Sequence, residues 1–232
     1  GQLDVAMISM LEQKFEKSRF TRVDSDVIDR LIAKEEHKEA NLESNQREIL
    51  SSVFRSQLPQ IKKVEFNVET QALGENGAPI MITQSEYMRR MKEMANIQAG
   101  MSFYGEMPNM YNLVLNADHK LVKQVLTDAD NSCKAALEPI ESEMANLNNR
   151  RKELQKAQEG KKTEDIPQAE KDELNDIEKK ISDETTKKQA VLGEYANGNK
   201  IIHQLIDLAL LQNNMLKGEA LTNFVKRSIE LI

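Results

Sequence analysis

The chain has 232 residues, of which 39% are hydrophobic, 30% are charged and 4% are aromatic, and its formal net charge is -6. This length allows one or two domains with a buried core, and the composition favours helices that expose much of their surface to water. The negative charge gives no electrostatic reason to expect binding to nucleic acid or to an anionic membrane. No apolar run approaches the ~20 residues that a transmembrane helix requires.

The single cysteine, Cys133, excludes an internal disulfide and fits a reducing compartment. We therefore expect a cytoplasmic protein. The first residues, GQLDVAMISMLEQKF (1–15), contain neither an initiator methionine nor a signal peptide. We interpret the sequence as part of a longer chain.

The first part of the chain predicts both helices and short strands. The segments with apolar residues at helical spacing are 5–15, 24–32 and 47–58. The segments that alternate as strands do are 18–23, 64–73 and 79–83. The turn sequence GENGAP (74–79) separates the last two, so we expect the strand at 79–83 to return beside the strand at 64–73. The polar stretch 33–45 is the best candidate for a linker.

Methionines are concentrated in one part of the sequence. Those that lie close together are Met81, Met88, Met91, Met94, Met101, Met107 and Met110. On a helix, Tyr87 shares one side with four of them, while arginine and lysine side chains on the other side are expected to face water. The methionine side is either part of the core or, because methionine is flexible and polarizable, a surface that adapts to variable partners.

A further strand and helix follow. The apolar run NLVLN (112–116) predicts a strand, and residues 118–126 predict a helix capped by Asp118. His119 lies in the first turn of that helix, where we interpret it as a capping or packing residue rather than a catalytic one.

Residues 128–197 form a highly charged segment. Apolar residues at spacings of three and four on both sides of QEGKKTEDIP (158–167) predict an antiparallel coiled-coil hairpin with arms of ~25 residues, or about 40 Å. Arg151, Glu184 and Lys188 interrupt its apolar seam. Two interpretations stay open, a solvated spacer or stiffening arm and an arm that binds a partner.

The last segment is far more apolar. Residues 201–211 are apolar nearly all round, residues 221–232 carry a wide apolar face, and the break between them is at Gly218. We predict that the two helices form a symmetric four-helix bundle with a second copy of the chain. The alternative is burial inside the same chain.

Together these elements predict an α+β fold. It consists of a small mixed sheet with helices, an inserted antiparallel coiled-coil hairpin, and a C-terminal helix pair that forms a dimeric four-helix bundle.

The sequence shows no arrangement of residues that would support catalysis. The histidines, His37, His119 and His203, are far apart and have no cysteine or paired carboxylates at metal-ligand spacing. No base is predicted beside Cys133, and no glycine-rich phosphate loop occurs. We therefore predict no catalytic residue, no metal site and no enzymatic activity for this chain.

Several separate segments resemble bacterial members of the ninety-kilodalton heat-shock chaperone family. They are VAMISMLEQKFEKSRFTRVDSD (5–26), EYMRRMKEMA (86–95), LVLNADHKLV (113–122), LIDLALLQNNMLKGE (205–219) and LTNFVKRSIELI (221–232). They are similar, in this order, to the end of the family's middle domain, its exposed amphipathic helix, its strand ending in N-x-D-H, and its two dimerisation helices. The resemblance covers nearly everything outside residues 128–197.

The resemblance implies a domain division and roles for particular residues. Residues 1–37 would be the end of the middle domain and 38–232 the C-terminal dimerisation domain, with 128–197 inserted. The implied dimer interface is Ile201, Ile202, Leu205, Ile206, Leu208, Leu221, Phe224, Val225 and Ile229. The implied contacts to unfolded or partly folded client proteins are Tyr87, Met88, Met91, Met94 and Met101.

The resemblance also sets expectations for cofactors and partners. The full-length protein would use ATP and magnesium at a site in an N-terminal domain absent here, so this part should bind no cofactor. Its partners would be a second copy and client proteins, with no nucleic acid and no membrane. Because the chain ends in SIELI, without an acidic tail peptide, helical-repeat co-chaperones are not expected.

The segment 128–197 leaves room for another function. The family usually lacks the segment 128–197, so the resemblance implies no role for it. The alternative to a chaperone domain is a structural coiled-coil adaptor that acts through this hairpin, and an enzyme with an unrecognised site is a remote third.

Overall fold

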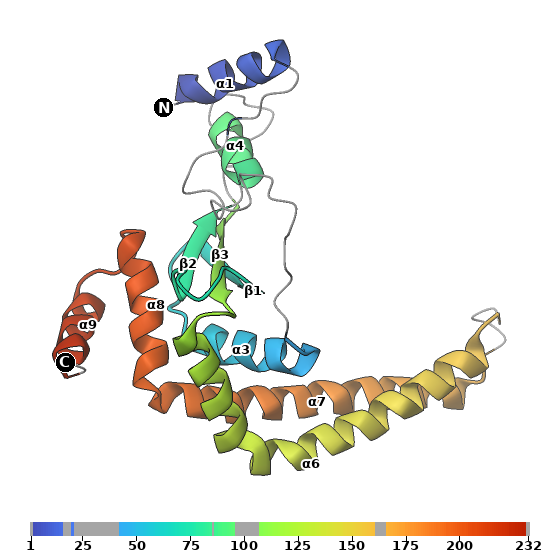
Figure 1. The fold of residues 1–232 in the computed structure, drawn as a ribbon. Coiled ribbons are helices and arrows are strands. Elements are labelled where there is room, and N and C mark those ends of the chain that lie inside the picture. The colour runs from blue at the N-terminus through green and yellow to red at the C-terminus, as the bar shows by residue number, and fades with distance from the viewer. Residues whose placement is uncertain are drawn as a thin grey trace.

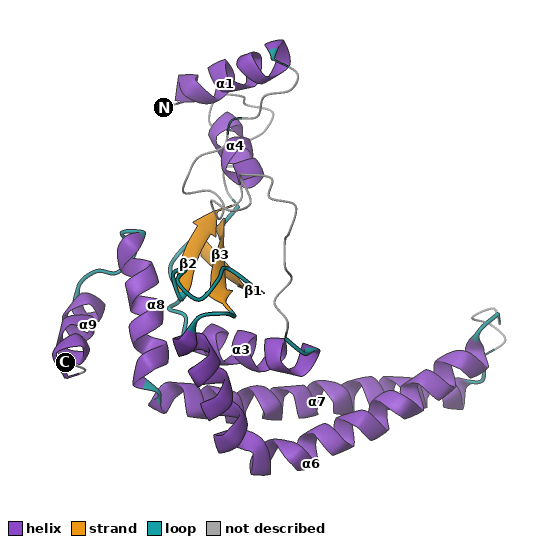
Figure 2. Ribbon diagram, viewed as in Figure 1, coloured by secondary structure: helices purple, strands orange, loops and turns teal. Residues whose placement is uncertain are grey.

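The computed structural model describes residues 2–15, 20, 42–84, 86–95, 107–160 and 166–230. Within them the chain is a mixed α+β protein (Figures 1 and 2). The helices are α1 (Gln2–Lys14), α3 (Ser44–Ser56), α4 (Glu86–Ala95), α6 (Lys120–Gln158), α7 (Gln168–Gly198), α8 (Lys200–Gln212) and α9 (Glu219–Glu230). The strands are β1 (Val64–Gln71), β2 (Ile80–Gln84) and β3 (Asn109–Asn116).

Most of the predicted elements in the described residues are present. Helices α1, α3, α4, α8 and α9 and all three strands fall where the apolar spacing predicted them. Helix α3 begins at Ser44, inside the predicted linker 33–45, because Glu43 and Gln46 form a capping box at its start. Most of 18–23, all of 24–32 and most of that linker lie outside the described residues.

The strand pairing differs from the prediction. The sheet order is β1-β3-β2, with β1 parallel and β2 antiparallel to β3. The strand at 79–83 therefore does not pair with the strand at 64–73, because β3 lies between them. Leu113, Val114 and Leu115 of β3 are fully buried, and a strand covered on both faces favours a central position.

Asn116 fixes the loop between β1 and β2. Its buried side-chain oxygen accepts hydrogen bonds from the backbone N–H groups of Leu73 and Asp118, and its amide donates to the carbonyl of Gly74. A Cβ on Gly77 would lie 2.7 Å from the carbonyl oxygen of Leu73, so the loop can pass this close only with glycine.

The cap of α6 also corrects the sequence prediction. His119 is the N-cap residue, and its Nδ1 accepts from the backbone N–H of Leu121 at 3.2 Å. The carboxylate of Asp118, predicted as the cap, instead accepts from the backbone N–H of Gly74 at 2.9 Å. The interpretation of His119 as a capping residue is confirmed.

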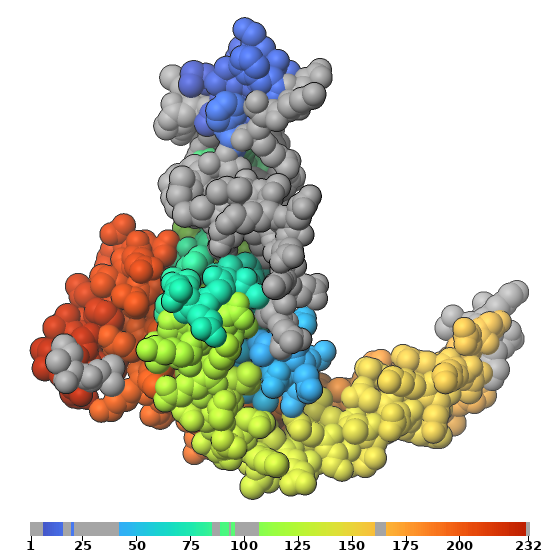
Figure 3. Space-filling model, viewed as in Figure 1, coloured from blue at the N-terminus to red at the C-terminus, as the bar shows by residue number. Residues whose placement is uncertain are grey.

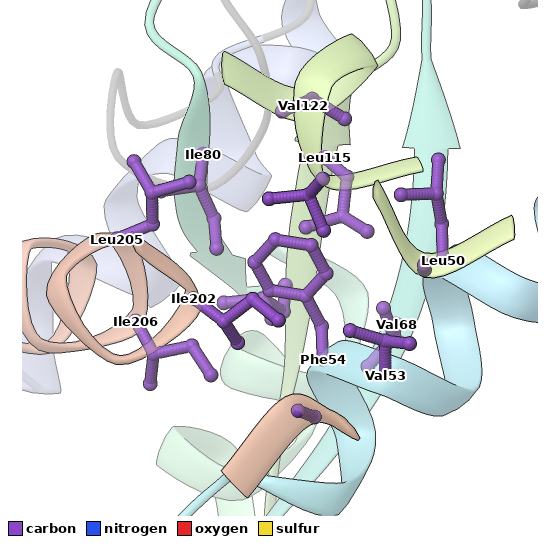
Figure 4. Close-up of a cluster of buried hydrophobic side chains, with 14 of the residues drawn as sticks. Leu50, Val53, Phe54, Val68, Ile80, Leu115, Val122, Ile202, Leu205 and Ile206 are labelled. Atoms are coloured by element: carbon purple, nitrogen blue, oxygen red, sulfur yellow. The ribbon is translucent and has the colours of Figure 1, made fainter. Parts of the chain in front are cut away.

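One hydrophobic core joins the sheet to the helices around it. Phe54 of α3 is fully buried and points toward Leu115 of β3 and Ile202 of α8 (Figure 4). Leu205 and Ile206 of α8 belong to the same core. Burial inside the same chain, the alternative left open for the C-terminal helices, thus accounts for one face of α8, because α3 and the sheet cover it.

Helices α6 and α7 extend beyond this core. Their outer parts, residues 140–158 and 168–187, lie side by side and project from the rest of the chain (Figures 1 and 3); we call them the arm. A second cluster of buried side chains, Leu147, Leu154 and Ile177, holds the arm together. Helix α6 runs without a break from Lys120 through position 128, the predicted start of the insertion.

We predict that Phe54→Ala destabilises the fold by about 3–5 kcal/mol, because it leaves a cavity where α3, β3 and α8 meet. Denaturant unfolding followed by circular dichroism measures this change. Phe15→Ala is the matched control, because Phe15 is 51% exposed and its loss should change stability by less than ~0.5 kcal/mol. Equal effects of the two substitutions would contradict the central place of Phe54.

Candidate interaction surfaces

Helix α4 carries the methionine-rich segment. Met91 and Met94 are both partly exposed, whereas Ala95 is buried. Tyr87 and Met88 lie in the helix, but their side chains are outside the described part of the structure, as is the whole of Met101. The structure therefore places two of the five predicted client contacts, on one turn of a single helix.

The charged side of α4 binds the rest of the chain. The guanidinium of Arg90 donates to the carboxylate of Glu12 in α1 at 2.8 Å and also to the carbonyl of Phe20. The ammonium of Lys92 donates to the side-chain oxygen of Asn109 in β3 at 2.7 Å. Burial, with a contribution from the charge of Lys63, lowers the pKa of Lys92. The expectation that this side simply faces water is wrong for Arg90 and Lys92, because both join α4 to its neighbours.

Helix α1 adds an exposed apolar surface that the sequence analysis did not single out. Met7 is 58% exposed and Met10 69% exposed, and Phe15 just after the helix is also exposed. The available signal was the three-residue spacing of the two methionines, which places them on one side of the helix. Because α1 contacts α4, these methionines lie on a neighbour of the helix that carries Met91 and Met94.

The predicted dimer residues of α8 divide between its two faces. Ile202, Leu205 and Ile206 are buried in the core of the same chain, and Ile201 packs against that core while partly exposed. Leu208 lies on the outer face and is 37% exposed, as is Leu211, which the sequence analysis did not include.

Helix α9 differs from α8, because none of its residues is buried. Leu221, Val225 and Ile229 recur every four residues and are exposed, Ile229 the most at 69%. Phe224 is partly buried and packs against the core. Three of the four predicted dimer residues on this helix are therefore in contact with solvent.

Polar contacts attach α9 to α8. Arg227 pairs with Asp207, and the amide of Gln204 donates to the hydroxyl of Ser228 at 2.6 Å. Burial raises the pKa of Asp207, although the charge of Arg227 acts in the opposite direction. Because the two side chains come from different helices, the pair fixes the orientation of α9 relative to α8.

The described residues offer little for catalysis. Among them no group of three or more histidine, cysteine or acidic side chains could hold a metal ion. Burial raises the pKa of the Cys133 thiol, which disfavours the reactive thiolate. His37 lies outside the described residues, and the ring of His203 contacts the backbone carbonyl of Asn197. No helix in the described part of the chain has the length and apolar character to cross a membrane.

The chain is similar along its whole length to known chaperones. It is 69% identical to the chaperone protein HtpG of Bacteroides fragilis and 68% identical to that of Bacteroides thetaiotaomicron, over 232 residues each. It is 46% identical over 234 aligned positions to the HtpG of Porphyromonas gingivalis. Each alignment covers 100% of this chain and 34% of the relative, so the chain spans about a third of these proteins' length.

These alignments include residues 128–197, so the segment that forms most of α6 and α7 is shared with the relatives. No protein-family model matches the chain. No solved structure matches it either. Over its full length the chain is thus 69% identical to the C-terminal region of HtpG, a chaperone of the ninety-kilodalton heat-shock family.

Proposed function

We propose that this chain is the homodimerising and client-binding part of an ATP-dependent chaperone in the cytoplasm. The names of the relatives support the chaperone role. The proposal assigns ATP and magnesium to another part of the longer protein, so this part binds no nucleotide and catalyses no reaction. The adaptor alternative is not favoured, because the relatives that share the hairpin segment are named as chaperones.

The exposed stripe on α9 is the observation that carries the proposal of a dimer. Leu221, Val225 and Ile229 are large apolar side chains that the described chain leaves 37%, 49% and 69% exposed. Exposed apolar residues in a row mark an interaction surface more often than isolated ones do. We infer that a second copy of this chain covers them, since a two-fold partner would present the same apolar stripe to this one.

The contacts of α8 fit the same arrangement. Its inner face is fixed in the core by Ile202 and Leu205, while Leu208 and Leu211 remain on the outside. The partner copy would therefore contact the outer face of α8 and the stripe of α9. The residues of the inner face of α8 would hold that helix in place by packing in the core of their own chain. This assigns direct contact to Leu208, Leu221, Val225 and Ile229.

The client surface is proposed on α4. Met91 and Met94 are partly exposed on a helix whose charged side is joined to α1 and β3 by Arg90 and Lys92. Those contacts fix the helix, so the flexible methionine side chains can adapt while the backbone beneath them stays in place. Unfolded segments of varied sequence are the partners that such a surface suits.

We predict that Val225→Asp with Ile229→Asp weakens dimerisation by more than about a hundredfold, because each change places a carboxylate in the centre of an apolar interface. Sedimentation over a dilution series of the full chain measures the dissociation constant. Met7→Asp with Met10→Asp is the control, since these residues have similar exposure but lie on α1. A chain that is monomeric without any substitution, or an unchanged constant in the α9 variant, would contradict the proposed dimer.

We predict that Met91→Ser with Met94→Ser reduces the affinity for an unfolded client by about tenfold or more, because apolar contact is lost. The measurement is suppression of client aggregation by the full-length protein, followed by light scattering. Met144→Ser, a partly exposed methionine of the arm, is the control and should leave suppression unchanged.

Thermal unfolding of the same variants separates binding from packing. If Met91 and Met94 form a client surface, the double variant should melt close to the parent. A large loss of stability would show instead that these side chains are part of the core.

A further inference from the structure

Helix α6 belongs to two separate hydrophobic clusters. Its inner part, with side chains up to Leu137, packs in the main core, and its outer part, from Leu147 onward, packs in the arm. Between these two residues α6 contributes no buried side chain. Pro139 lies in this interval, and a proline inside a helix removes a backbone hydrogen bond and bends the helix, as α6 bends in Figure 1.

Helix α7 also has an interval between the two clusters in which no apolar side chain is buried. Between Ile177 of the arm and Leu192 of the main core, its only fully buried side chain is that of Lys188. Lysine is almost never buried unless its charge is paired. The residue that interrupts the apolar seam thus lies where the two clusters separate.

The ammonium of Lys188 contacts both of the other helices at this junction. It lies 3.0 Å from a carboxylate oxygen of Glu48 and 3.1 Å from the side-chain oxygen of Asn45, both in α3. It also lies 3.1 Å from a carboxylate oxygen of Glu141 in α6. The contacts with Asn45 and Glu48 are hydrogen bonds, whereas the contact with Glu141 is an ion pair without hydrogen-bond geometry. One side chain thus joins α3, α6 and α7.

The inner end of α7 cannot pivot independently of the core. Asn199 alone separates α7 from α8, and its side chain accepts from the backbone N–H groups of Ile201 and Ile202. In addition, the amide of Gln57, the C-cap residue of α3, donates to the carbonyl of Gly193 in α7. A change in the direction of the arm must therefore arise farther out, at the junction of Lys188 and Pro139.

We propose that this junction is a hinge and that Lys188 locks it, which fixes the direction of the arm relative to α3 and, through Asn199, to α8. At this junction neither α6 nor α7 contributes a buried apolar side chain, so close packing does not set the direction of the arm there. An ammonium held by groups from two other helices does, since its donors must meet acceptors at fixed distances. The arm is then a lever whose position is set by one ion-pair network, whether or not the chain dimerises.

Spin labels at Lys156→Cys in the arm and Gln212→Cys at the end of α8 test the lock, with Cys133→Ala in the background. Both labelled positions are exposed, and an excess of unlabelled chain restricts the measured distances to one copy. The parent should give one narrow distance distribution. Lys188→Met, which keeps length and removes charge, should broaden or shift it by several ångström.

Lys187→Met is the matched control. Lys187 is exposed and pairs only with Glu184 of its own helix, so its loss should leave the distribution narrow. Glu141→Gln keeps the test decisive if Lys188→Met does not fold, because Glu141 is 39% exposed and its loss removes only the α6 side of the network. A broad parental distribution would overturn the proposal, and so would a narrow, unshifted one in Lys188→Met, or in Glu141→Gln where Lys188→Met does not fold.

Discussion

The packing of α8 against Phe54 and the sheet is the contact on which the rest of the structure depends. Ile202 and Leu205 enter the core from the C-terminal part of the chain, and Leu115 enters it from the central strand. Because only Asn199 separates α7 from α8, this contact also fixes the base of the arm. It fixes α9 in turn, since α9 is attached to α8.

This contact changes how the predicted dimer residues divide. Resemblance treats both C-terminal helices as interface, but one apolar face cannot be buried in two places at once. Since α8 places its inner face in its own chain, a partner can reach only its outer face. Helix α9 buries none of its residues in its own chain, so Val225 and Ile229 become the centre of the proposed interface rather than its edge.

Sequence patterns predicted the elements better than their pairing. Apolar spacing located α3 and α8, because the face that each helix buries follows the helical period. It could not show that β3 separates β1 from β2, since strand order depends on contacts distant in sequence. It also could not show the role of Lys188, because the carboxylates that hold it come from two other helices and one of them is 140 residues away. For α4, periodicity showed a methionine side, but not that Arg90 on the other side would join α1.

Different forces hold the centre and the periphery of this chain. The centre is apolar, whereas α4, α9 and the arm are each oriented by a cation that meets a carboxylate of another element. The pairs of α4 and α9 are partly exposed, whereas the lysine of the arm pair, Lys188, is buried. In each case the pair defines the direction of the element. An apolar attachment would have used the surfaces that these elements now expose. Because polar pairs set the orientation of α4 and α9, with Phe224 as the one apolar anchor of α9, the stripe of α9 and the methionines of α4 remain on the surface, where partners can reach them.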